Sequence, residues 1–238
     1  MMRFERFADA ETLSRHVAAE VVAAVRARPD LLLCPATGAT PRRTYALLAE
    51  QARHDPGLFA RLRLVQLDEW GGLPEGHPAS CTAALRRALL DPLGVGPDRF
   101  LGWQGVEADP AGVCAALSRR LAEEGPIDLC LLGLGLNGHL GFLEPANWLP
   151  LKAHRAVLSA ATRGHGMVAH LPDPPDHGWT LGLGEIMAAR RILLLVTGTH
   201  KQAVLRRLRR ERVSTHLPAS FLHLHPDATC LFDVAAGR

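Results

Sequence analysis

The chain has 238 residues, of which 47% are hydrophobic and 21% charged, a composition typical of a globular protein that excludes extensive disorder. Its formal net charge of +3 is spread along the sequence, so we expect no nucleic-acid partner. No apolar run reaches about 18 residues, and we therefore expect no membrane segment. The N-terminus lacks the apolar stretch of a secretory signal, and the five cysteines form no CxxC pair. These features predict reduced cysteines and a cytoplasmic location.

Helical and apolar β-like segments alternate along the chain. Leu13, Val17, Val21 and Val25 lie four residues apart, which predicts a helix over 10–28 with Asp9 as its N-cap. We expect further helices over 41–52, 80–90, 110–124 and 201–210, and strands over 31–34, 62–67, 127–132, 192–196 and 229–232. Short apolar strands separated by helices indicate a mostly parallel sheet with helices on both faces. The expected fold is α/β and Rossmann-like, in a single domain spanning residues 1–238.

The loops after the strands of such a sheet meet at one edge, where ligands bind. The first of these loops, residues 35–41, reads PATGATP and leads directly into a helix. Its backbone N–H groups and two threonines could hold a phosphate at the positive end of that helix. The loop lacks the GK[ST] ending of a Walker A motif, and a simple tight turn is the alternative.

Two adjacent acids, Asp68 and Glu69, end the second predicted strand. Successive residues of a strand point to opposite faces, so one carboxylate could face a ligand while the other is a structural partner. A purely structural role for both acids stays open.

Residues 133–145, GLGLNGHLGFLEP, follow the third apolar strand. The glycines permit close approach of a ligand, and His139 and Glu144 are candidate chemical groups. The downstream acid of a dinucleotide site is not evident, and the two residues lack the tight spacing of metal ligands. We therefore expect neither a cofactor nor a metal.

Lys201 is one of only two lysines in the chain and lies at the start of the last predicted helix. A cation is unfavourable at that end of a helix unless it has an anionic partner. A compact ammonium suits a phosphate contact. A solvated helix residue is the alternative.

Taken together, these loops resemble the motifs of the amino-sugar-6-phosphate deaminase (isomerase) family, which is related to the 6-phosphogluconolactonases. The matching segments are 37–41 (TGATP), 67–70 (LDEW), 133–145, 198–201 (GTHK) and 218–226 (PASFLHLHP). They follow the order of the family and cover nearly the whole chain. The resemblance implies a fold of the sugar-phosphate isomerase type.

The resemblance also implies a phosphorylated amino sugar as the partner and assigns the site residues. Asp68 would move a proton from C2 to C1 of the opened sugar, His139 would assist ring opening, and Glu144 would orient the imidazole. The phosphate would be held by Thr37, Gly38, Ala39, Thr40 and Lys201.

Within the family, the segments 36–41, 137–141 and 213–221 look more like galactosamine-6-phosphate deaminases. The expected reaction therefore gives tagatose 6-phosphate and ammonia. Asn137 stands in the catalytic loop where the glucosamine enzymes have an aspartate, which removes a negative charge beside the histidine. Met167 or Val168 occupies the region of their substrate-contacting arginine, which leaves Arg163 as a candidate substrate-binding residue. The chain ends without the C-terminal extension of the allosteric hexamers, so we expect no amino-sugar effector site, and a homo-oligomer stays open.

Three other functions stay open. They are glucosamine-6-phosphate deaminase giving fructose 6-phosphate, 6-phosphogluconolactonase, and a non-catalytic sugar-phosphate sensor. The lactonases carry a different phosphate loop and no Glu-Pro after the histidine. A sensor would not need Asp68, His139 and Glu144 together.

Overall fold

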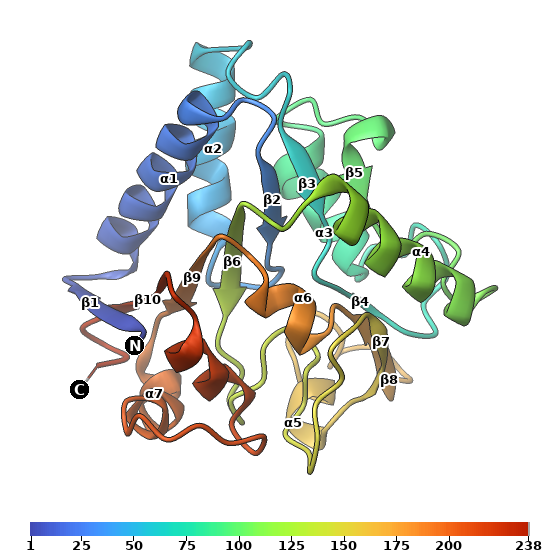
Figure 1. Cartoon of the computed structure of the whole chain (residues 1–238), viewed down its shortest axis with the longest axis vertical. Helices are drawn as coiled ribbons and strands as arrows, with labels where there is room; N and C mark the ends of the chain where they lie inside the picture. Colours follow the sequence, from blue (N-terminus) through green and yellow to red (C-terminus); the bar gives the residue numbers. More distant parts are fainter. Residues whose placement is uncertain (238) are drawn as a thin grey trace.

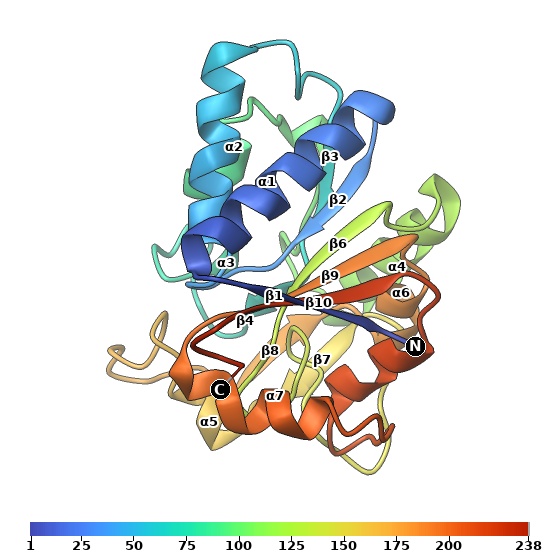
Figure 2. The ribbon, with the colours of Figure 1, turned by 90° about the vertical axis from the view of Figure 1, so that its left-hand side faces the viewer.

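The computed structural model describes residues 1–237 and contains a large and a small sheet. The large sheet has seven strands in the order β1-β10-β9-β6-β2-β3-β5, and all its neighbouring pairs are parallel. Its strands are β1 (Arg3–Phe7), β2 (Leu32–Pro35), β3 (Arg63–Val65), β5 (Phe100–Leu101), β6 (Leu129–Gly133), β9 (Arg191–Val196) and β10 (Ala228–Asp233). Helices cover both faces of this sheet (Figure 1 and Figure 2), so the expected Rossmann-like α/β fold is confirmed.

The helices largely follow the apolar patterns of the sequence. The first begins at the predicted N-cap, where the Asp9 side chain accepts a hydrogen bond from the Thr12 N–H group. The predicted helix over 80–90 divides into an α-helix and a π-helical turn, and the one over 201–210 is preceded by a 3₁₀ turn. The helices are α1 (Ala10–Ala27), α2 (Arg42–His54), α3 (Cys81–Leu85), α4 (Pro110–Glu124), α5 (Ala160–Arg163), α6 (Leu183–Met187) and α7 (Gln202–Leu208), with the π turn η1 (Arg86–Leu90) and the 3₁₀ helices η2 (Pro97–Arg99), η3 (Thr199–Lys201) and η4 (Pro218–Leu224).

Alternation along the strands sorts the core into two layers. Leu33 and Leu131 point to the face that is covered by α1 and α2. Their neighbours Leu32 and Leu132 point to the other face and pack against α4, α6 and α7. Because both faces are covered, the strands are continuously apolar rather than alternating, which is why they could be found in the sequence.

The prediction of a strand over 62–67 is wrong at its end. β3 stops at Val65, and the chain leaves the large sheet. The next segment, β4 (Asp68–Trp70), pairs antiparallel with β8 (His177–Thr180), which pairs in turn with β7 (His154–Val157). The two acids therefore belong to the small sheet, which lies near the carboxyl ends of β2 and β6 in Figure 1. The sequence patterns predict neither this sheet nor β1, β5, α5 and α6.

No helix within residues 1–237 is both long and apolar enough to cross a lipid bilayer.

Candidate active site

A cavity of about 300 Å³ opens at the carboxyl edge of β2 and β6. It is lined by the loop after β2, by β4, by the loop after β6, by α5 with the segment that follows it, and by η3. The cavity brings together most of the site residues predicted from the sequence, namely Thr37, Gly38, Ala39, Thr40, Asp68, His139 and Lys201. Asn137 and Glu144 are not among the lining residues, but Asn137 is hydrogen-bonded to His139, and Glu144 lies beside the His139 ring. Arg163 is exposed at the end of α5 and is not among the lining residues.

The loop after β2 presents unpaired backbone donors to the cavity. Among the contacts within residues 1–237, the N–H groups of residues 37–40 donate to no protein acceptor. Gly38 has a φ of +111°, a conformation that side-chain-bearing residues rarely adopt. α2 starts two residues after Thr40. Unpaired N–H groups at the start of a helix of this length attract anions.

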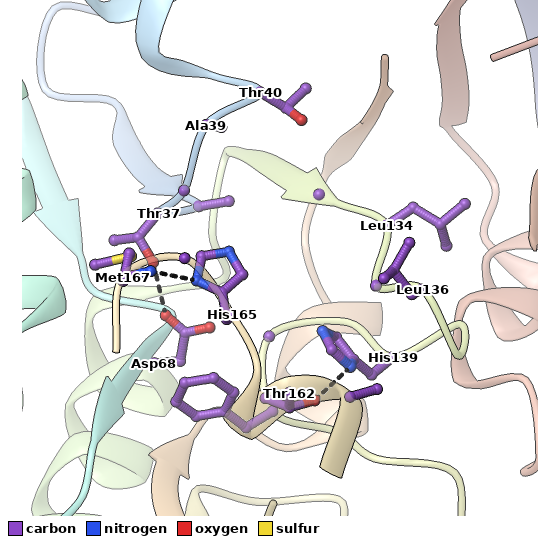
Figure 3. A pocket seen from close by; sticks show the side chains of 18 of the residues that line it. Thr37, Ala39, Thr40, Asp68, Leu134, Leu136, His139, Thr162, His165 and Met167 are labelled. Carbon is purple, nitrogen blue, oxygen red and sulfur yellow. Dashed lines mark hydrogen bonds between the residues drawn. The ribbon is translucent and has the colours of Figure 1, made fainter. Parts of the chain in front are cut away.

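Asp68 is the acid of the cavity and is only 6% exposed. Thr37 Oγ1 donates to Asp68 Oδ1 at 3.4 Å and also lies 3.4 Å from Cys81 Sγ (Figure 3). Burial, together with the neighbouring charge of Glu69, raises the pKa of Asp68 to about 7. The Thr37 hydroxyl therefore has an acceptor in both the Asp68 and the Cys81 side chain, whereas its backbone N–H group has none in the described protein and is free for an anion.

Glu69 points the other way, as strand alternation predicts. Its carboxylate accepts hydrogen bonds from the backbone N–H groups of Trp70 (2.8 Å), Cys81 (2.7 Å) and Thr82 (2.8 Å). The Gln66 side chain adds a further donor at 3.0 Å. Glu69 thus ties β4 to the start of α3 and fixes the strand from which Asp68 projects.

On the opposite wall, His139 is joined to Glu144 through the Thr162 hydroxyl. Thr162 Oγ1 donates to Glu144 Oε1 and lies 3.2 Å from His139 Nδ1. Because the Thr162 proton is used on Glu144, its oxygen accepts from His139 Nδ1–H, which leaves Nε2 with a lone pair in the neutral imidazole. A Cβ atom at Gly135 would lie 2.4 Å from His139 Nε2, so only glycine fits beside this ring.

Asn137 completes this wall with both ends of its amide. Oδ1 accepts from the His139 backbone N–H at 3.2 Å, while Nδ2 donates to Glu144 Oε2 at 2.7 Å and to Ser159 Oγ at 3.2 Å. Burial alone would raise the pKa of Glu144. The imidazole of His139 and the hydrogen bonds from Thr162 and Asn137 outweigh it and lower the pKa to about 2.

Lys201 reaches the cavity from η3, and its Nζ donates to the Leu134 carbonyl oxygen at 2.5 Å. Partial burial lowers the pKa of this ammonium. Within residues 1–237, no three histidine, cysteine, aspartate or glutamate side chains come together as metal ligands.

Sequence patterns missed the contribution of the segment around α5. Thr162 and His165 line the cavity, and Ser159 contacts Glu144. Met167, which the sequence places in the region of the family's arginine, also lines the cavity. The Ser-x-x-Thr spacing at 159–162 could have marked a helix start, because Ser159 caps α5 through the Thr162 N–H group. Val168, which lies in the region of the family's arginine, is fully buried.

Comparisons with known proteins show the family of this chain. Residues 6–231 match the family described as "Glucosamine-6-phosphate isomerases/6-phosphogluconolactonase". The chain is 39% identical to "Putative deaminase AgaI" of Escherichia coli (strain K12), over 93% of this chain and 88% of that protein. It is 40% identical to a glucosamine-6-phosphate deaminase of Streptomyces avermitilis, over 88% and 81% of the two chains.

Among solved structures, a monomeric glucosamine-6-phosphate deaminase superposes with a TM-score of 0.93 and 31% identity, covering 99% of this chain and 98% of that one. A 6-phosphogluconolactonase from Trypanosoma brucei has a TM-score of 0.76 at 21% identity, covering 99% and 97%, and shares the fold. The match of the family model over nearly the whole chain, with relatives near 40% identity, shows that this chain belongs to the family of glucosamine-6-phosphate isomerases and 6-phosphogluconolactonases.

Proposed function

We propose that this enzyme is an isomerising deaminase that converts galactosamine 6-phosphate and water to tagatose 6-phosphate and ammonia. The observation that carries the isomerising deaminase reaction is the presence, in one cavity, of a buried acid and an imidazole. The choice of the galactosamine epimer rests on the resemblance of segments 36–41, 137–141 and 213–221. With its pKa raised to about 7, Asp68 can both accept and return a proton near neutral pH. His139 presents an unprotonated Nε2 when neutral.

In the proposed mechanism, His139 accepts the proton of the C1 hydroxyl and gives a proton to the ring oxygen, so that the bond between C1 and the ring oxygen breaks and the sugar opens. Asp68 then removes the proton from C2 and delivers it to C1. A second proton passes from the amino nitrogen to O1, so that the amino aldose becomes a ketose imine. Water adds to the imine carbon, and ammonia leaves. Glu144 stays ionised and supports the imidazolium through Thr162. General acid–base catalysis of this kind contributes about 10²–10⁴-fold.

The phosphate would lie against the free N–H groups of residues 37–40 and the ammonium of Lys201. These groups touch no reacting carbon, so their binding energy would serve to position C1 and C2. The free thiols of all five cysteines suit a reducing compartment, and we propose a cytoplasmic location.

Glucosamine 6-phosphate is the second candidate substrate. It is favoured by the names of the relatives, several of which are glucosamine-6-phosphate deaminases. The two sugars differ only in the configuration at C4. Ammonia release measured on both substrates side by side tests the proposal. We expect a higher kcat/KM with galactosamine 6-phosphate. A higher value with glucosamine 6-phosphate would favour the second candidate, and no ammonia from either sugar would refute both.

Lys201→Ala tests the phosphate site. A charge-assisted contact contributes about 1.5–3 kcal/mol, so KM should rise by roughly 10–150-fold, and unphosphorylated galactosamine should be a very poor substrate. Lys152→Ala, the same change at the exposed second lysine, should leave KM as it is. An unchanged KM in Lys201→Ala would remove this residue from the phosphate site.

A further inference from the structure

His165 lines the cavity but belongs to none of the motifs that suggested the family. It follows α5, and its ring lies beside Trp70, with ring centroids 5.9 Å apart. The Met167 backbone N–H donates to His165 Nδ1 at 3.3 Å, as Figure 3 shows. A nitrogen that accepts a hydrogen bond carries no proton, so the neutral ring holds its proton on Nε2.

The protonated nitrogen of His165 faces the loop with the unpaired backbone donors. A Cβ atom built on Gly38 would lie 3.7 Å from His165 Nε2. Apart from Gly38 and its two chain neighbours, no other heavy atom lies closer to that position. Within residues 1–237, Nε2 has no hydrogen-bond partner in the protein. His165 therefore presents a free donor beside Gly38, in the loop where the N–H groups of residues 37–40 have no acceptor in the described protein.

Two charged side chains and a second imidazole, from three other elements, act on His165 through their charge. Lys201 comes from η3, His139 from the loop after β6, and Arg42 from the first residue of α2. Partial burial, and then each of these groups, lowers the pKa of His165. Asp68 is the acid among the lining residues, and its Oδ1 is bound to Thr37. An excess of positive charge around several free donors is the arrangement that an anion stabilises.

We infer that His165 is a ligand of the substrate's phosphate group and takes up a proton when the phosphate binds. This inference rests on the proposed function for the identity of the substrate. It concerns a residue outside the motif loops and a proton that is separate from the one moved between C2 and C1. In the empty cavity the neighbouring cations keep the imidazole neutral, with Nε2–H as a donor.

Binding of a phosphate dianion reverses the local field. The negative charges offset Lys201 and Arg42, so the imidazolium becomes the favoured form and donates a charge-assisted hydrogen bond. Affinity for a phosphate ester should then fall as the pH rises from the pKa that His165 has in the empty cavity to the higher pKa that it has in the complex, by up to about tenfold per pH unit, and should level off above that range. The chemistry at C1 and C2 is remote from this contact, so the effect should appear in KM rather than in kcat.

Binding of galactitol 6-phosphate tests the inference, because this ester has no amino group and cannot be deaminated. Calorimetric titration near pH 7.5 in two buffers of different ionisation enthalpy measures the protons taken up per ligand bound. We expect uptake in the wild type. In His165→Gln we expect that uptake to be lost and the Kd to rise about tenfold. His170→Gln is the matched control and should behave as the wild type, because His170 is exposed like His165 but does not line the cavity.

Two results would overturn the inference. One is that His165→Gln takes up as many protons as the wild type and binds the ester with the same Kd. The other is His165→Gln with weaker binding but unchanged uptake, since the proton would then go to another group. A thermal melt of each variant checks that both histidine variants are folded. If the wild type binds the ester with His165-dependent uptake but releases no ammonia from either amino sugar, the proposed reaction fails while the phosphate role of His165 stands.

Discussion

The two walls of the cavity carry the same chemical group in opposite states. On the β4 wall, Asp68 is buried beside a second acid, and burial raises its pKa to about 7. On the wall formed by the loop after β6, Glu144 accepts hydrogen bonds from Asn137, Ser159 and Thr162, and its pKa is lowered to about 2. The difference shows that well-placed donors can outweigh burial. One carboxyl can therefore exchange a proton near neutral pH, while the other stays charged.

The largest effect should come from removing the basicity of Asp68. Asp68→Asn keeps the shape of the side chain but cannot accept a proton, so kcat should fall by about 10²–10⁴-fold while KM changes little. In D₂O, the wild type should place deuterium at C1 of the ketose. Steady-state kinetics and NMR of the product measure both effects.

Glu69→Gln is the matched variant, because it changes the neighbouring acid on the other face of β4. It removes the charge that helps to raise the pKa of Asp68, so the pH at which kcat/KM declines on the acid side should move below about 7. Its kcat should fall far less than that of Asp68→Asn. Full activity in Asp68→Asn would refute the proposed proton transfer.

The ionised carboxylates of Asp68 and Glu144 should have opposite effects on the free energy of unfolding. Asp68 has a folded pKa of about 7 against an ordinary value of 3.8, so its ionised form opposes folding. This cost is absent below about pH 4, grows as the pH rises, and is complete above pH 7, where it is on the order of 4 kcal/mol. Asp68→Asn should therefore raise the Tm at pH 8 and have less effect at pH 4.

Glu144 should show the reverse dependence. Its folded pKa of about 2 lies below the ordinary 4.5, so its ionised form stabilises the fold above pH 4.5, and this stabilisation is lost as the pH falls toward 2. Glu144→Gln should cost about 1–3 kcal/mol at pH 7 and little at pH 2. Thermal melts of Asp68→Asn and Glu144→Gln between pH 2 and pH 8 test both predictions. If Asp68→Asn and Glu144→Gln changed the Tm at pH 8 in the same direction, the opposite pKa shifts assigned to the two acids would be contradicted.

The sequence predicts the β6 wall better than the β4 wall. His139, Asn137 and Glu144 lie within eight residues of one loop, so their proximity follows from a local pattern. For Asp68 and Glu69, alternation indicates opposite directions but not which acid faces the cavity. That choice depends on β4 leaving the large sheet and pairing with β8, more than 100 residues later. Pairings over such sequence distances leave no periodic signal in three-residue strands.

The same reason explains the residues that the sequence patterns missed. Ser159, Thr162 and His165 come from a four-residue helix and the turn after it, too short for an amphipathic pattern. Glu144 and His139, the partners of Ser159 and Thr162, lie about 15 to 23 residues earlier in the chain. The seven-stranded sheet, in contrast, was predictable because burial on both faces makes its central strands continuously apolar.

The smallest effect should come from Asn137→Asp, which alters the β6 wall without removing a group. Asn137 Nδ2 donates to Glu144 Oε2 at 2.7 Å, so an aspartate would place two carboxylates at hydrogen-bond distance. Two such groups cannot both ionise freely, and the pair should hold a proton to a higher pH than Glu144 does alone. Once both are ionised, the added negative charge favours the imidazolium of His139. The limb of the kcat–pH profile that reports the imidazole should then move upward by about one pH unit, and the preference between the two epimers should shift toward glucosamine 6-phosphate.

Aspartate is as compatible with a turn as asparagine, so a residue that merely shapes the loop would give the same profile in both forms. The kcat–pH profiles of the wild type and Asn137→Asp on both sugars separate these cases. Superimposable profiles with an unchanged epimer preference would leave Asn137 as a turn residue. The hydrogen bond from Asn137 to Glu144 would then have no part in setting the charges of Glu144 and His139.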